Sequence, residues 1–169
     1  MDWIKLIQGG GDGDVKLWSL DCKHVKTLSS SDDGVLTMVH IESLLYTGHI
    51  SGTINLWDLD TMQMIRSVKA HQADVLSLSG IGGFAFSGSA RGVLKKWDLR
   101  YPSLLSYTEE SRGFECVNQW QAHNGIVLSS TIGGSRLITG GNDCFVSIWD
   151  ISACIPSEPK EESGISTQI

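Results

Sequence analysis

Four segments of fourteen residues share one alternation of apolar and polar positions. Each begins with an apolar residue, carries glycine at its third position, makes a polar turn, and returns to an alternation that ends at tryptophan and two further residues. The segments occupy residues 7–20, 46–59, 86–99 and 138–151, and they align without a gap. Alternation with a period of two predicts strands, and glycine with polar residues between two such runs predicts a turn. Each segment is therefore expected to form a pair of antiparallel strands.

A second spacing extends this unit to four strands. The tryptophans that close the segments are separated by 39, 40 and 52 residues. His71 and His123 each precede the tryptophan of their repeat by 26 residues, and an apolar run begins four residues after each histidine. Looser apolar runs follow the tryptophans at about 24–28, 63–68 and 115–120. Four short strands per repeat of about 40 residues, with turns between them, indicate the blade of a radial β array.

Trp-Asp closes three of the four repeats, at 57–58, 97–98 and 149–150, and Trp-Ser stands at 18–19. With the fixed upstream histidine, this register resembles the WD40 β-propeller family over about residues 4–151. The resemblance implies an all-β fold, namely a partial WD40 propeller of three to four four-stranded antiparallel blades. The blades are expected around residues 4–28, 35–68, 75–120 and 126–151.

The repeat spacing also predicts irregular parts. Twelve extra residues fall after the third tryptophan, within 100–113, where they lengthen a loop at one rim. The first repeat lacks an opening strand and the last lacks a closing one. Residues 152–169, rich in Ser, Glu and Pro, are expected to form a disordered tail after the repeats of residues 1–151. Because closed propellers have at least four complete blades, we expect self-association through the open blade ends.

Composition excludes several classes of function. The net charge is −6 and no Lys/Arg cluster occurs, so a nucleic-acid partner is not expected. The four cysteines form no CxxC pair and the histidines form no HxxxH spacing, so neither a metal nor a cofactor is expected. No signal peptide or membrane-length apolar run is present, which predicts no membrane partner. The expected location is the cytoplasm, with the nucleus as the alternative.

The resemblance implies a hydrogen-bonded tetrad inside each blade, formed by His, Ser or Thr, Asp and Trp. The fourth repeat has all members: His123, Thr139, Asp143 and Trp149. The other repeats are incomplete, with these residues in register: His71, Ser87, Arg91 and Trp97; Ser31, Thr47, Ser51 and Trp57; Gln8, Asp12 and Trp18. A Ser-His-Asp hydrolase is the catalytic alternative, but no nucleophile-elbow motif is present. We therefore expect structural tetrads and no catalytic residues.

Arg91 stands where the tetrad has aspartate, so its side chain should point outward. The resemblance places it on the face where WD40 propellers engage partners, and arginine is favoured at binding hot spots. The neighbours expected on that surface are His49, Ser89, Asn142 and Asp74. The alternative is a degenerate repeat that tolerates a surface arginine.

The sequence therefore predicts a non-catalytic scaffold or adaptor that binds other proteins through the propeller face. Two alternatives stay open. The chain is the propeller part of a larger protein, such as those that join WD40 blades to a metallopeptidase-like domain in glutathione degradation. Otherwise it is a truncated, non-functional relic whose exposed blade edges favour aggregation.

Overall fold

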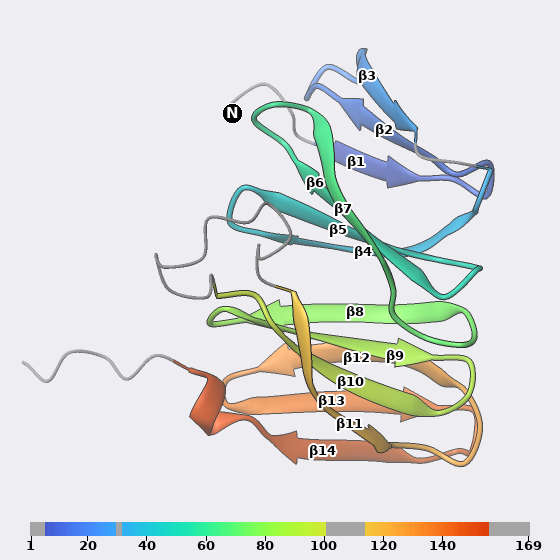
Figure 1. The fold of residues 1–169 in the computed structure, drawn as a ribbon, viewed down its shortest axis with the longest axis vertical. Coiled ribbons are helices and arrows are strands. Elements are labelled where there is room, and N and C mark those ends of the chain that lie inside the picture. The colour runs from blue at the N-terminus through green and yellow to red at the C-terminus, as the bar shows by residue number, and fades with distance from the viewer. Residues whose placement is uncertain (1–5, 30–31, 101–113, 156–169) are drawn as a thin grey trace, which may run out of the picture.

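The computed structural model describes residues 6–29, 32–100 and 114–155. These residues form four antiparallel sheets that are stacked in chain order, as Figure 1 shows, and we call them blades 1 to 4. The strands of blades 1 and 2 are β1 (Leu6–Gly9), β2 (Asp14–Trp18), β3 (His24–Ser29), and β4 (Val35–Ile41), β5 (Leu44–His49), β6 (Thr53–Asp58), β7 (Gln63–Lys69). Those of blades 3 and 4 are β8 (Val75–Ile81), β9 (Phe84–Ser89), β10 (Val93–Asp98), β11 (Glu115–Gln121), and β12 (Val127–Gly133), β13 (Arg136–Gly141), β14 (Val146–Asp150). The predicted all-β, partial propeller fold is confirmed.

Sequence repeats and blades share one register. In every blade the closing tryptophan pairs with an equivalent residue of the preceding strand, in the pairs Leu6–Trp18, Leu45–Trp57, Ala85–Trp97 and Leu137–Trp149. Bulges recur next to the tryptophan on β2, β6 and β10, where each strand pairs with the strand that follows it. A bulge increases the local twist of a sheet. The described residues form three strands in blades 1 and 4 and four in blades 2 and 3.

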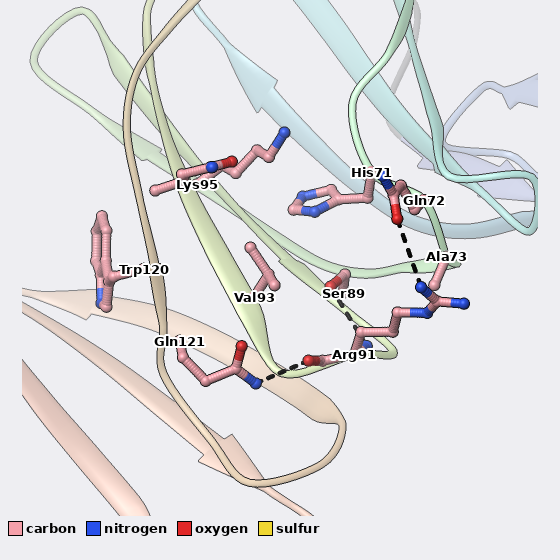
Figure 2. A pocket seen from close by; sticks show the side chains of 10 residues that line it. His71, Gln72, Ala73, Ser89, Arg91, Val93, Lys95, Trp120 and Gln121 are labelled. Carbon is pink, nitrogen blue, oxygen red and sulfur yellow. Dashed lines mark hydrogen bonds between the residues drawn. The ribbon is translucent and has the colours of Figure 1, made fainter.

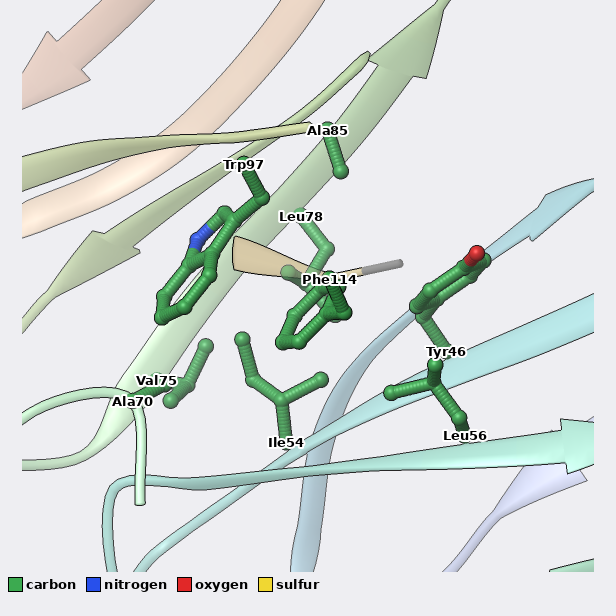
Figure 3. Close-up of a cluster of buried hydrophobic side chains, with 9 residues drawn as sticks. All are labelled: Tyr46, Ile54, Leu56, Ala70, Val75, Leu78, Ala85, Trp97 and Phe114. Carbon is green, nitrogen blue, oxygen red and sulfur yellow. The ribbon is translucent and has the colours of Figure 1, made fainter. Parts of the chain in front are cut away.

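The core lies between the blades rather than within them. The tryptophan face of a blade, which carries the closing tryptophan, packs on the blade before it. The aliphatic face is the opposite one, and it packs on the blade that follows. Figure 3 shows this arrangement between blades 2 and 3, where Ile54 and Leu56 are 0% and 4% exposed and share a cluster with Trp97. Phe114 stacks on Trp97 in the same cluster, with ring centroids 4.4 Å apart.

The same division of faces recurs at the other two junctions. Val15 and Leu17, on the aliphatic face of blade 1, share a cluster with Trp57 of blade 2. Leu94 of blade 3 shares a cluster with Leu137 and the half-buried Trp149 of blade 4. Burial of such side chains stabilises each junction by about 1.5–3 kcal/mol per large aliphatic residue. Interactions between neighbouring blades therefore hold the array together.

Glycine keeps adjacent blades close. A Cβ atom built on Gly48 would lie 2.7 Å from Val75 Cγ1, and one on Gly88 would lie 2.5 Å from Val127 Cγ1. Only glycine therefore fits where the second strand of one blade meets the first strand of the next. Because Gly9 meets Val35 in the same way, this contact explains the glycine at the third position of the first three repeats.

Two sequence predictions concern segment boundaries. The predicted tail begins too early, because Ser152–Cys154 form a 3-10 helix and Cys154 is buried in a cluster with Ile151. Residues 156–169, most of the inserted loop of 100–113, and Ser31 lie outside the described residues.

Candidate functional site

Blade 4 brings the four predicted tetrad residues together. His123 Nε2 lies 2.9 Å from Thr139 Oγ1, and Trp149 Nε1 donates to the same oxygen at 3.1 Å. His123 Nδ1 lies 3.0 Å from Asp143 Oδ1, while the Asn124 amide donates to Asp143 Oδ2 at 2.9 Å. The Asp143 carboxylate can only accept, so His123 Nδ1 donates to it, and Nε2 of the neutral ring then accepts from the Thr139 hydroxyl. The His123 ring proton then lies on Nδ1 and faces the carboxylate.

Asp143 is held as an anion by these contacts. Partial burial works against its charge, but hydrogen bonds from the amides of Asn124 and Phe145 and from His123 outweigh that penalty and lower the pKa of the Asp143 carboxyl. His123 and Thr139 are 3% and 0% exposed. All their hydrogen-bonding groups that face the tetrad are used inside the blade, which is the pattern of a structural network.

Blade 3 has the same chain of bonds without its carboxylate. His71 Nε2 lies 2.6 Å from Ser87 Oγ, and Trp97 Nε1 donates to Ser87 Oγ at 2.8 Å. Burial and the nearby charge of Lys95 lower the pKa of His71 to about 4, so its ring is neutral at physiological pH. Arg91 is exposed and takes the sequence position that Asp143 has in blade 4.

Blade 2 uses a histidine from an unexpected position. His49 Nε2 lies 2.9 Å from Thr47 Oγ1, and Trp57 Nε1 donates to Thr47 Oγ1 at 3.1 Å. His49 Nδ1 lies 2.8 Å from the backbone oxygen of Asp33. His49 thus supplies the imidazole that His71 and His123 supply from loops. The alternation of a strand could have predicted this position, because residues 47 and 49 of one strand point to the same face.

Blade 1 contains no such network among its described residues. Trp18 Nε1 is buried without a hydrogen-bond partner in the part of the chain that the structure describes. Asp12 instead binds locally, accepting from the Asp14 amide at 3.2 Å and facing Lys16 Nζ at 3.7 Å. The tetrad series is therefore graded, from complete in blade 4 to absent in blade 1.

The predicted partner surface is only partly exposed. Arg91 and Asn142 are exposed and Asp74 is half-buried, whereas His49 and Ser89 are 0% and 1% exposed. Including His49 and Ser89 in that surface was wrong. Both pair with the first residue of the neighbouring strand, so the strands continue through them and the turns begin one residue later.

A cavity of about 380 Å³ opens beside Arg91 on blade 3 (Figure 2). It is lined by the β7–β8 loop, by the β9–β10 turn and by parts of β10 and β11. Its lining includes two cationic side chains, Arg91 and Lys95, and the neutral ring of His71. Among the residues that the structure describes, the Arg91 guanidinium has only a long hydrogen bond to Gln72 Oε1, at 3.5 Å.

Two features are absent from the described residues. No group of three or more His, Cys, Asp or Glu side chains there could hold a metal ion. Nor is any helix in residues 6–29, 32–100 and 114–155 long and apolar enough to cross a membrane.

Comparison with known proteins identifies the repeat. The family model "WD domain, G-beta repeat" matches residues 114–150. The chain is 27% identical to the probable di- and tripeptidase DUG2 of Saccharomyces cerevisiae, over 91% of this chain and 18% of that protein. It is 26% identical to the WD repeat-containing protein slp1 of Schizosaccharomyces pombe, over 95% of this chain and 32% of that protein. The chain thus spans less than a third of the length of either relative.

A solved structure shares the fold. The computationally designed Ika4 protein superposes with a TM-score of 0.70 at 21% sequence identity, over 86% of this chain and 84% of its own. Four blades in one register, the family-model match over residues 114–150 and the likeness to the WD repeat-containing protein slp1 lead to one assignment: the chain belongs to the WD40-repeat family.

Proposed function

We propose that the chain is a non-catalytic protein–protein interaction module, with a scaffold or adaptor role. His123, the histidine of the hydrolase alternative, is engaged in a buried hydrogen bond to Thr139, as His49 and His71 are to Thr47 and Ser87. The expected partners are other proteins, and the expected location is the cytoplasm, with the nucleus as the alternative. The observation that supports a protein partner most strongly is the state of the two end blades.

The aliphatic face of blade 4 has no blade against it among the described residues. Val146 and Ile148 are 70% and 59% exposed. By strand register they correspond to Ile54 and Leu56 of blade 2, which are 0% and 4% exposed. The same side chains that form a core at an internal junction are therefore presented to solvent, as at an interaction site.

In the described part of the chain, no blade lies against the tryptophan face of blade 1 either. Leu6 is 57% exposed, whereas its register equivalents Leu45, Ala85 and Leu137 are 2%, 0% and 0% exposed. The two open faces are the two halves of an internal junction. We therefore propose a second copy of this chain as the occupant, with blade 4 of each copy docked on blade 1 of the other. Such a closed dimer would have eight blades, within the usual range for propellers.

Light scattering coupled to size exclusion, over a concentration series, tests this proposal. Wild type should form a dimer, and Ile148→Lys should weaken it roughly 100- to 1,000-fold, because each of two junctions loses about 2 kcal/mol. Val117→Lys is the matched control, since Val117 is 50% exposed on β11 of blade 3. A folded wild-type monomer at every concentration would contradict the self-association. Aggregation without a cooperative thermal transition would support the truncated-relic alternative.

A second candidate function is the propeller part of a larger protein, fused to an enzyme domain. The likeness to the probable peptidase DUG2, which covers 91% of this chain and 18% of that protein, favours it. Glycine packing favours it too. Gly9, Gly48 and Gly88 each abut the opening valine of the next blade, whereas a Cβ on Gly140 would meet only Ser129 Oγ within 4 Å. Sequencing transcripts beyond both ends tests this alternative, because further repeats and a peptidase region in one reading frame would establish it.

A further inference from the structure

The cavity on blade 3 is a binding site of defined chemistry. We propose that it is a slot for a carboxylate, supplied by a Glu or Asp side chain of a protein partner, which takes the place that Asp143 fills in blade 4. This inference rests on the proposed protein-binding function and specifies the group that the partner must present.

Blade 4 is the internal precedent for the slot. There a carboxylate accepts from the histidine Nδ1 at 3.0 Å and from the next backbone amide, that of Asn124, at 2.9 Å. The carboxylate belongs to the chain itself and comes from the β13–β14 turn. An equivalent slot in another blade should therefore present two hydrogen-bond donors to an anion, one from the histidine ring and one from the backbone.

Blade 3 presents the same donors to the cavity. We assign His71 the tautomer of His123 in blade 4, in which Nε2 accepts from the hydroxyl beside it, here that of Ser87, and the ring proton lies on Nδ1. Neither His71 Nδ1 nor the Gln72 amide has a hydrogen-bond acceptor among the described residues. Both residues line the cavity, as Figure 2 shows.

Two cations make the slot selective for an anion. Within the described residues, neither Arg91 nor Lys95 has a carboxylate within 4.0 Å, and Lys95 Nζ lies 5.7 Å from the Trp97 ring centroid. An uncompensated cationic pair in a concave site attracts a negative group, the more so on a chain whose net charge is −6. A planar carboxylate also matches the fork of the Arg91 guanidinium. A volume of about 380 Å³ accommodates an acidic side chain and part of its backbone.

Titration with two blocked tripeptides, Ala-Glu-Ala and Ala-Gln-Ala, tests the slot by heteronuclear NMR in a buffer free of carboxylates. We expect saturable shifts at the Gln72 amide and the His71 ring with the Glu peptide and none with the Gln peptide. A bound carboxylate should also raise the pKa of His71 from about 4. Arg91→Ala should weaken binding about tenfold, as the loss of a charge-assisted hydrogen bond does. Lys26→Ala, at an exposed lysine of β3, should leave it unchanged.

Arg91→Asp provides the sharpest comparison. The introduced carboxylate should occupy the slot as Asp143 does, so peptide binding should disappear while the melting temperature rises. Equal binding of the Gln peptide, undiminished binding by Arg91→Asp, tighter binding of inorganic phosphate than of the Glu peptide, or no saturable shift at all would each overturn the proposal. None of these results alters the assembly state measured by light scattering, so failure of the slot and failure of the end-face proposal are distinguishable.

Discussion

Thr139 is the centre of the blade 4 tetrad, and its replacement by valine isolates the energy of that network. Valine has nearly the volume of threonine, so Thr139→Val leaves no cavity and removes only the hydroxyl. Two groups lose their partner, namely His123 Nε2 and Trp149 Nε1. A buried polar group left unsatisfied costs about 1–3 kcal/mol. His123 is 3% exposed and Trp149 is half-buried, so we expect a loss of about 2–4 kcal/mol in the free energy of unfolding.

Urea unfolding, followed by circular dichroism and tryptophan fluorescence, measures this loss. With a dependence of the unfolding free energy on urea of about 2 kcal/mol per molar, the midpoint should fall by about 1–2 M. The two signals must coincide, because an array of blades can unfold in steps. Thr131→Val, an exposed position on β12 of the same blade, is the matched control and should change stability by less than about 0.5 kcal/mol. An equally small effect at Thr139 would refute the view that the tetrad stabilises blade 4.

Three further predictions concern single residues. Phe114→Ala should destabilise the protein by roughly 3–5 kcal/mol in urea unfolding, because Phe114 is 2% exposed between Tyr46 and Trp97. Folding lowers the pKa of His71 from 6.5 to about 4, so as the pH falls the unfolded chain takes up a proton at this residue before the folded chain does. The free energy of unfolding should therefore fall by about 3 kcal/mol between pH 6.5 and about 4. A His71→Gln variant should lack this part of the acid sensitivity in melting curves. The pKa of Asp143 in the folded chain lies below 3.8. The stability advantage of wild type over Asp143→Asn should therefore be complete at neutral pH and disappear as the pH falls through that lowered pKa. A persistent advantage in strong acid would contradict the view that the Asp143 carboxylate stabilises the tetrad.

Most of the fold could be predicted from the sequence because the residues that recur in each repeat are those that the geometry of a blade requires. Trp57 and Trp97 fix the register, and Gly48 occurs where Val75 leaves no room for a Cβ. A period of two then assigns every side chain on a strand to one face or the other. The WD40 resemblance implied the tetrad of blade 4, and its members lie at the offsets from Trp149 that the family pattern predicts.

The exceptions arise where neighbours in space are not at the family's offsets. The family's offsets place the tetrad histidines in loops and so predict a surface position for His49, whereas its parity with Thr47 places it inside. Phe114 follows an insertion with no periodic signal, so its stacking on Trp97 could not be read from spacing. The cavity on blade 3 joins His71, Arg91 and Lys95 from three elements. Arg91 stands there at the position of the tetrad aspartate, so the repeat pattern shows only a mismatch at this site.

The junctions of this fold connect nearest neighbours, with β4 against β8 and β8 against β12. Duplication or loss of a whole blade at one end therefore changes a single junction and leaves all the others as they were. Such an array can change its length one repeat at a time during evolution, without redesign of the parts that remain. The terminal faces are consistent with such a history, because Ile148, although exposed, has the apolar side chain that its equivalents have at an internal junction.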